Sequence, residues 1–339
     1  MAGGTFLSGG HFLSGRHFLS GRQFLSWICL ALASTPLPAQ QPAFKAAVEL
    51  VTVPLTVTTR DRDRFITDAL TPADFRAFED GVPQTVTLLS QVRLPVSLCI
   101  VVDASGSMSA GLKHDVAVRA LQATGGGLSP DDEIAIVKFA KTASVMLPWT
   151  PVPQARGLAW ELQVEGETSL NDALRLALAL TDEAKNPRRA ILLITDGFEN
   201  ASRTLVSEVV TTRRQSETLV YAFGLVSLSE PRRAGPPTIF DRFDTSSMAQ
   251  RPQGSIPNLD VLPSLVGDSG GALTRVHSDA DAKAAAQRLI SELRYQYTLG
   301  YVPTKPLDGK YRRIKVETTR RDLRVRHRGG YLALPSMAQ

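Results

Sequence analysis

The sequence predicts an α/β fold built on a mostly parallel sheet, flanked by a β-sandwich-like domain formed from both ends of the chain. Two short, continuous apolar runs, at residues 96–102 and 190–194, are typical of strands buried on both faces of a parallel sheet. Helical periodicity separates these runs, whereas residues 48–58 and 295–301 alternate between apolar and polar side chains. The two β-rich ends are expected to pair with each other, because neither forms a stable sheet alone.

Length and composition indicate an ordinary folded protein of more than one domain. The chain has 339 residues, of which 43% are hydrophobic and 21% charged, with a formal charge of +5. This length exceeds one typical domain, and the hydrophobic fraction is sufficient for a core. The small excess of positive charge does not indicate nucleic acid or a membrane surface as a partner.

Residues 1–39 are predicted to be a secretory signal peptide with a short N-terminal repeat. Phe-Leu-Ser-Gly recurs at Phe6, Phe12 and Phe18 with His and Arg between copies, and residues 27–33 form an apolar stretch followed by small residues. This order is typical of signal peptides, and the stretch is far shorter than the roughly 20 residues that span a bilayer. The mature protein is therefore expected to be secreted, periplasmic or part of the cell envelope, without a transmembrane segment.

Cysteine usage favours a bacterial envelope protein over a small secreted module. Cys29 lies in the apolar stretch of the signal peptide, which leaves Cys99 inside the first apolar run. One cysteine forms no internal disulfide, and a buried thiol behaves as a small hydrophobic side chain.

The N-terminal β segment is expected to cover residues 45–92. Its alternating stretch at 48–58 is rich in β-branched residues. Pro72 favours the start of a helix, and Asp80-Gly81 predicts a tight turn between two strands.

The C-terminal β segment, residues 294–334, is expected to pair with the N-terminal one. Besides residues 295–301, alternation continues at 313–317 and 323–326. Arginines alternate with apolar residues in the run 320–328, which predicts a strand with a basic solvent face. A nucleic-acid site is the alternative for this run, but no aromatic side chains are interleaved to stack on bases.

The middle of the chain, residues 95–293, follows the pattern of one α/β domain. Helices are predicted at 112–124, 170–184 and 280–293, and further strands at 134–139, 144–147, 218–224 and near 272–276. Residues 226–258 are rich in Pro, Arg, Ser and Gly and are predicted to be a long loop insertion.

The strongest functional signal is the turn that follows the first apolar run. Asp103, Ser105 and Ser107 place a carboxylate and two hydroxyls close together in the sequence. Divalent cations such as Mg²⁺ prefer oxygen ligands and leave some coordination positions to water or to a partner. For this turn alone, the alternative is that Ser105 or Ser107 caps the next helix.

Two later segments favour the metal site. Thr168 lies in a hydroxyl-bearing loop that opens a helical pattern, and Asp196, followed by glycine, closes the second apolar run. In order and approximate spacing, the series Asp103-x-Ser105-x-Ser107, Thr168 and Asp196 resembles the metal-ion-dependent adhesion site of von Willebrand factor type A domains.

The resemblance covers roughly residues 96–293 and implies a doubly wound sheet and a role in binding proteins, not in transforming a substrate. It also implies that the three hydroxyls contact the cation directly while the two carboxylates hold it largely through water. Neutral hydroxyls leave the charge of the ion poorly quenched, so an Asp or Glu of a partner protein can complete its coordination. Mg²⁺ is expected, and Mn²⁺ or Ca²⁺ can substitute. Asn171 and Asp172 are expected to serve as first-turn helix residues, with orientation of the Thr168 loop as the alternative.

The whole layout resembles bacterial secreted proteins described only as von Willebrand factor A-related. The points of likeness are Asp74-Phe75, residues 78–81 and residues 329–331. The insertion at 226–258 leaves the carboxyl end of a parallel strand, where doubly wound sheets carry their ligand crevice. It is therefore expected to overhang the metal and shape partner choice; a variable loop without a role is the alternative.

Three other functions are open. Residues 267–271, Gly-Asp-Ser-Gly-Gly, copy the nucleophile loop of trypsin-like proteases, but a glycine-rich turn is also expected between a helix and a strand. A metal-dependent phosphatase would use Asp103 as nucleophile, but Ser105 stands where that chemistry needs a second acid. The third is a structural envelope protein with a non-functional metal site.

Overall fold

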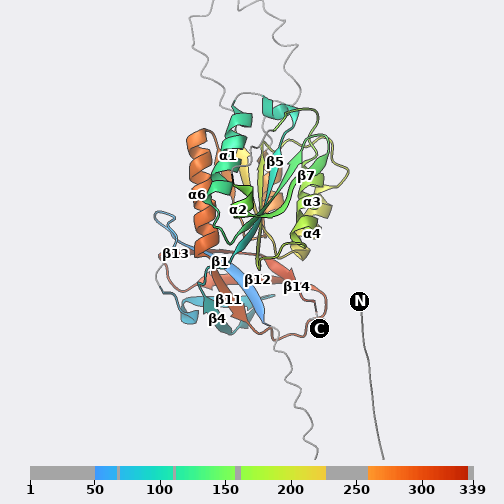
Figure 1. Ribbon diagram of the computed structural model, residues 1–339. Coiled ribbons are helices and arrows are strands. Elements are labelled where there is room, and N and C mark those ends of the chain that lie inside the picture. The colour runs from blue at the N-terminus through green and yellow to red at the C-terminus, as the bar shows by residue number, and fades with distance from the viewer. Residues whose placement is uncertain (1–49, 67–68, 110–111, 157–161, 227–258, 335–339) are drawn as a thin grey trace, which may run out of the picture. The chain divides into compact units, whose positions relative to one another are not determined.

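The computed structural model describes residues 50–66, 69–109, 112–156, 162–226 and 259–334 (Figure 1). The predicted signal peptide, and the predicted insertion apart from residue 226, lie outside these stretches. Among the described residues, no helix combines the length and the apolar character needed to cross a membrane.

A six-stranded, mostly parallel sheet forms the centre of the larger part of the molecule, in the order β10-β9-β8-β5-β6-β7. Its strands are β5 (Val96–Asp103), β6 (Glu133–Phe139), β7 (Ala143–Pro151), β8 (Arg188–Thr195), β9 (Leu219–Leu225) and β10 (Leu273–Val276). Every residue of β5 is buried, including Cys99, as expected for a strand with helices over both faces. β7 pairs antiparallel with β6, whereas the other neighbours pair in parallel.

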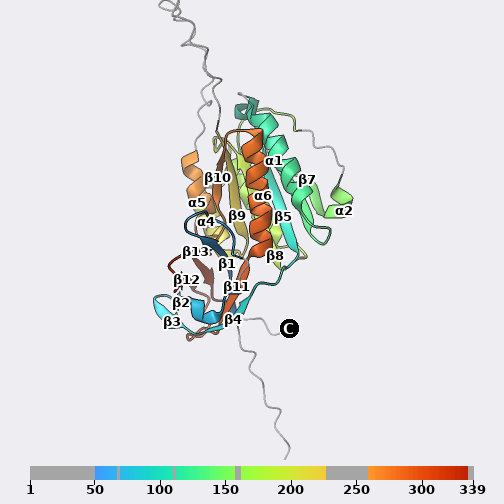
Figure 2. The same ribbon diagram turned by 90° about the vertical axis from the view of Figure 1, so that its left-hand side faces the viewer.

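Helices cover both faces of this sheet, which confirms the predicted doubly wound α/β class. α1 (Lys113–Gly127) and α6 (Asp279–Tyr295) lie side by side on one face, in front of the sheet in Figure 2. α3 (Leu170–Thr181), α4 (Val206–Gln215) and α5 (Leu262–Val266) pack on the other. A short helix, α2 (Val152–Ala155), follows β7.

Helical segments differ from the prediction in several places, since the short helices α2 and α5 were also not predicted. α4 was not predicted, because it buries only Val209 and Arg213 and so lacks the wide apolar stripe of an amphipathic helix. α3 ends at Thr181 rather than 184, where the N–H of Asp182 already turns to the carbonyl of Ala179. The predicted helix start at Pro72 is a single 3₁₀ turn.

Both chain ends contribute strands to two four-stranded antiparallel sheets, ordered β13-β1-β11-β4 and β14-β12-β2-β3. The strands are β1 (Val51–Thr59), β2 (Phe75–Glu79), β3 (Val82–Gln84), β4 (Val86–Ser90), β11 (Tyr297–Tyr301), β12 (Tyr311–Thr318), β13 (Leu323–His327) and β14 (Gly330–Leu332). One hydrophobic core, which includes Leu55, Leu299 and Val316, joins the two sheets. The predicted β-sandwich-like domain from both ends is therefore confirmed.

The basic run at residues 320–328 confirms the predicted basic solvent face only in part, because Arg320, Arg321 and Arg324 are exposed but Arg326 and Arg328 pair with acidic residues. Arg326 forms an ion pair with Glu292 of α6, and the buried Arg328 pairs with Glu217 at 2.7 Å. Alternation predicted one covered face for β13, but the α/β part of the chain packs against its other face as well.

Glu292 ties the two parts of the molecule together. Its buried carboxylate accepts hydrogen bonds from Thr56 Oγ1 of β1 at 3.0 Å and from Tyr221 Oη of β9 at 2.6 Å, besides the ion pair with Arg326. A buried carboxylate persists only with such partners, so α6 is fixed to both the central sheet and the β-sandwich.

Candidate metal-ion site

The predicted site residues gather at the carboxyl edge of the central sheet, where the strand order reverses. β5 lies between β6 and β8. The chain adds β6 and β7 on one side of β5 and then adds β8, β9 and β10 on the other side. Val102 is in register with Ile194, which brings Asp103 at the end of β5 next to Thr195 and Asp196. Thr195 Oγ1 donates a hydrogen bond of 2.6 Å to Asp103 Oδ2. Such switch points are where doubly wound sheets bind their ligands.

The turn after β5 is held by the carboxylate that begins it. Asp103 Oδ1 accepts hydrogen bonds from the N–H of Ser105 at 2.9 Å and from its Oγ at 2.6 Å. Ser107 Oγ lies 3.1 Å from Ser105 Oγ. The two hydroxyls therefore face one small space. Neither Ser105 nor Ser107 accepts a capping bond from α1, which begins at Lys113, so the capping alternative does not apply.

The loop that carries Thr168 is tied to this turn through the backbone. The N–H of Gly106 donates to the carbonyl of Gly166 at 3.0 Å, and that of Glu165 donates to Ala104 at 2.9 Å. A Cβ atom on Gly106 would lie only 3.0 Å from that Gly166 oxygen, so the approach requires glycine. The two loops are thus held against each other.

The third segment, which follows β8, is tied to Thr168. The N–H of Thr168 donates to Asn200 Oδ1 at 2.7 Å, and the N–H groups of Asn200 and Ala201 donate to the carbonyl of Thr168 at 3.0 Å. The side chain of Thr168 is nearly buried, yet its hydroxyl has no hydrogen-bond partner among the described residues. The structure thus brings together all three predicted segments.

A buried lysine that the sequence did not single out completes the site. Lys113, the first residue of α1, places Nζ 2.6 Å from Asp196 Oδ2, and both side chains are almost fully buried. Burial raises the pKa of Asp103 to about 6, an effect that its hydrogen bonds to Ser105 and Thr195 only partly oppose. When ionised, Asp103 and Asp196 carry two negative charges against the one positive charge of Lys113, which leaves the site one negative charge in excess.

Two acidic residues position the loops around the site, and sequence reasoning missed one of them, Glu199. Glu199 accepts hydrogen bonds from the N–H groups of Asn171, Ala201 and Ser202, which joins the loop after β8 to the start of α3. Asp172 does the same through the N–H groups of residues 203 and 204. Glu199 lies in a loop and has no local sequence signal, whereas Asp172 is an acidic residue in the first turn of α3. Asp172 therefore does more than the first-turn role expected of it.

The donor set fits a hard divalent cation. Three hydroxyls and two carboxylates supply oxygen alone, which Mg²⁺, Mn²⁺ and Ca²⁺ prefer. No group of three or more His, Cys, Asp or Glu side chains in the described part of the chain could hold a metal, as expected for a site with only two acids. The unpartnered hydroxyl of Thr168 and the excess negative charge both favour a bound cation.

The alternative nucleophile, Ser269, has a structural role. Its Oγ donates to the carbonyl of Val266 at 2.7 Å and accepts from the N–H groups of Val220 at 3.0 Å and Gly271 at 3.1 Å. These backbone contacts use the hydroxyl to fix the turn before β10. A nucleophilic serine needs a base at hydrogen-bond distance, and no histidine is among the contacts of Ser269.

Comparisons with known proteins find a family match within the central domain. Residues 98–199 match the family model of the von Willebrand factor type A domain. Human inter-alpha-trypsin inhibitor heavy chain H4 is 26% identical over 216 residues, which are 59% of this chain and 20% of that protein. An uncharacterized protein, sll0103, from Synechocystis is 31% identical over 109 residues, or 31% of this chain and 26% of that one. This chain therefore matches only a small part of the curated relatives' length.

Among solved structures, proximal thread matrix protein 1 from the mussel byssus, described with a zinc-occupied MIDAS motif, is 14% identical with a TM-score of 0.46. The match covers 64% of this chain and 50% of that one.

Proposed function

We propose that this chain, which contains a von Willebrand factor type A domain, binds an acidic side chain of a partner protein through a divalent cation. Domains of this family are typically protein-binding adhesion modules, usually without catalysis. The proposed ligands are Asp103, Ser105, Ser107, Thr168 and Asp196, with Mg²⁺ as the expected ion and Mn²⁺ or Ca²⁺ as substitutes. The proposal is supported by the hydrogen bonds that join Asp103 to Ser105 and Thr195, by the approach of the Ser105 and Ser107 hydroxyls, and by the backbone contacts that tie the loop of Thr168 to this turn.

The charges of the site explain why a carboxylate is the expected partner group. Asp103 and Asp196 contribute two negative charges and Lys113 one positive charge, so a bound dication gives a net charge of +1. A partner carboxylate neutralises that charge and supplies the oxygen ligand that a hard cation prefers. A partner lysine or arginine is repelled. The bound cation supplies the Lewis acidity, and this chain's own residues fix its position and set the net charge.

The side chains divide this task between them. Asp103 accepts a hydrogen bond of 2.6 Å from the Ser105 hydroxyl. This contact orients the hydroxyl oxygen, and no further charged residue is needed to hold it. Lys113 fixes Asp196, and the Asn200 side chain fixes the backbone of Thr168. Ser107 and Thr168 hydroxyls have few partners of their own, so they are free to turn toward an ion.

A second function is favoured by one observation. Lys113 already gives the site a cation that pairs with Asp196, so the fold does not depend on a metal for charge balance at that carboxylate. A structural envelope protein with a non-functional metal site is therefore the alternative proposal.

In either case we propose export to the cell envelope or beyond, with domain limits at residues 45–92, 95–293 and 294–334. The predicted role of the insertion 226–258 stays part of this proposal.

Calorimetric titration of the full chain with Mg²⁺ separates the two functions. The proposal expects one binding site per chain, weakened at least tenfold by Ser107→Ala and by Thr168→Ala. Ser129→Ala, at the opposite, amino edge of the sheet in the turn before β6, is the matched control and should bind as the wild type does. Absence of Mg²⁺ binding, or equal binding by all four proteins, favours the structural alternative.

A further inference from the structure

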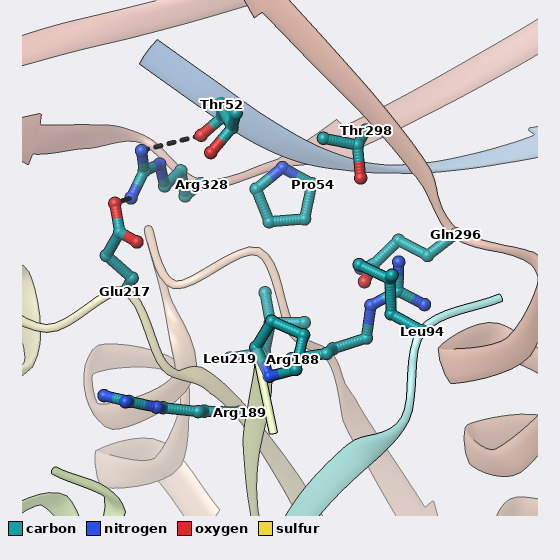
Figure 3. Close-up of a pocket in the computed structure, with 11 residues that line it drawn as sticks. Thr52, Pro54, Leu94, Arg188, Arg189, Glu217, Leu219, Gln296, Thr298 and Arg328 are labelled. Carbon is teal, nitrogen blue, oxygen red and sulfur yellow. Dashed lines mark hydrogen bonds and ion pairs between the residues drawn. The ribbon is translucent and has the colours of Figure 1, made fainter. Parts of the chain in front are cut away.

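A cavity lies at the amino edge of the central sheet, opposite the edge that carries the candidate metal-ion site. It lies where β5 and β8 begin beside the β-sandwich. Its volume is about 220 Å³. Figure 3 shows its polar side chains, which include Arg188, Arg328, Gln296 and the carboxylate of Glu217 that pairs with Arg328, together with apolar side chains. The apolar side chains include Pro54, Leu94 and Leu219. None of these residues takes part in the candidate metal-ion site.

Arg188 is a buried cation without a counter-ion. Only 6% of this residue is exposed, and its one hydrogen bond within the described residues runs from Nη1 to the carbonyl of Leu293 at the end of α6. No carboxylate of the described chain forms an ion pair with it. Burial lowers the pKa of its guanidinium, because a desolvated cation without a partner is costly.

Two further polar atoms at this cavity have no partner. They are Gln296 Oε1, on a residue only 1% exposed, and Arg328 Nε. The rest of the Arg328 guanidinium is satisfied, because it donates to Glu217 and to the carbonyl of Thr52. Folded proteins pair nearly all of their buried polar groups with protein, water or ligand atoms, so these donors and acceptors mark the cavity as a place that can hold a polar ligand.

The chemistry of the lining selects the ligand class. One unpaired guanidinium matches one carboxylate, and a planar carboxylate can accept two parallel N–H bonds from it. The unpaired Gln296 oxygen needs a donor, and a hydroxyl provides one without adding a cation beside the arginines. Pro54, Leu94 and Leu219 offer an apolar wall, which an inorganic oxyanion cannot use.

We propose that this cavity binds a small organic hydroxy-carboxylate. Its carboxylate pairs with Arg188, its hydroxyl donates to Gln296 Oε1, and its carbon skeleton lies against the apolar wall. The contact of Arg188 with the last turn of α6 places the ligand where this helix passes into β11. This inference does not depend on the proposed function, because the two sites share no residue.

The test is thermal unfolding of the full chain, with chelator present, in sodium lactate, acetate, phosphate and chloride at equal ionic strength. We expect a saturable rise in Tm with lactate, a smaller rise with acetate, and no difference between phosphate and chloride. A rise with phosphate as large as that with lactate, or no rise with lactate, overturns the proposal.

Variants test whether the rise in Tm with lactate arises from binding at this cavity. Arg188→Gln should abolish the lactate shift, whereas Arg189→Gln, which alters the more exposed neighbouring arginine, should retain it. If Arg188→Gln does not fold, Thr298→Phe decides, because it fills the cavity from β11 and removes no hydrogen bond made by the Thr298 side chain. A lactate shift that survives Thr298→Phe or Arg188→Gln contradicts the proposed binding site.

Discussion

Lys113 is the residue that most changes the charge of the candidate metal-ion site. Its ammonium and the carboxylate of Asp196 are both almost fully buried and lie 2.6 Å apart. In the sequence it is one lysine near the start of a helix, where an exposed position is the ordinary expectation. Two cations can therefore neutralise the carboxylates of this site, the ammonium of Lys113 and the proposed metal ion.

Replacing Lys113 by methionine is expected to strengthen Mg²⁺ binding and weaken the apo fold. Loss of the ammonium removes its repulsion of the dication, so the Kd should fall at least about tenfold, or ~1.4 kcal/mol. In chelator, the unpaired buried Asp196 should lower the free energy of unfolding by about 3 to 5 kcal/mol. Calorimetric titration and denaturant unfolding measure the two effects.

The matched control for this prediction is Lys141→Met. Lys141 also pairs with an acid, Glu167, but both of those side chains are largely exposed, so the free energy of unfolding should change by less than about 1 kcal/mol. Weaker Mg²⁺ binding by the Lys113 variant would show instead that the ammonium positions Asp196 for the metal.

Ser269 is expected to affect stability and not any hydrolytic activity. Ser269→Ala leaves the buried N–H of Val220 without its acceptor, which should lower the free energy of unfolding by about 1 to 3 kcal/mol. Denaturant unfolding measures this loss, with the exposed Ser264→Ala as control. Esterase activity in the wild type that is lost in Ser269→Ala, with an unchanged free energy of unfolding, would support a serine hydrolase instead.

At the scale of elements, β13 carries a histidine whose hydrogen bonds require the neutral ring. His327 Nε2 accepts from the N–H of Val316 at 3.0 Å, and Nδ1 lies 2.7 Å from the carbonyl of Arg328, to which it donates. Burial lowers the pKa of His327 below its ordinary value of 6.5. The unfolded chain therefore binds a proton at a higher pH than the folded one.

Stability should consequently fall as the pH drops below about 6.5, because the unfolded state then binds more protons. Unfolding measured between pH 7.5 and 5 should show a steeper loss for the wild type than for His327→Gln. The exposed His277→Gln serves as control and should follow the wild type. Identical pH profiles for all three proteins would mean that His327 does not carry this effect.

The elements that could be predicted are those whose burial shows in the sequence. β5 and β8 are continuous apolar runs because both of their faces are covered. α4 was not predicted because it buries so few residues. Arg326 and Arg328 were assigned to solvent because their partners, Glu292 and Glu217, are far away in the chain. Only the folded structure shows such pairs.

The candidate site could be predicted to a similar degree. Asp103 and Asp196 lie where buried strands end, and Thr168 lies just before a helix. Local sequence patterns are strong at such places, so these residues could be predicted. Lys113 and Asn200 act through contacts between segments that are distant in sequence. No local pattern marks a residue of this kind, because its role depends on strand order and register.

At the scale of the whole molecule, Glu292 joins the two folded parts into one cooperative unit. Glu292→Ala removes an acceptor for Thr56, Tyr221 and Arg326. It should lower the free energy of unfolding by about 3 to 5 kcal/mol, because Arg326 loses its buried partner. Denaturant unfolding measures the loss, and Glu183→Ala, an exposed acid, should change it by less than about 0.5 kcal/mol. Equal stability of both variants would argue that the network does not hold the parts together.

The most direct test of the central claim is a crystal structure of the full chain grown with Mn²⁺, with data collected to locate manganese by anomalous scattering. We expect one manganese peak at the carboxyl edge of the central sheet, at coordination distance from the hydroxyl oxygens of Ser105, Ser107 and Thr168. Its open coordination position should face away from Lys113. A map without a peak at that edge, or with manganese bound elsewhere, would contradict the proposed metal-dependent binding.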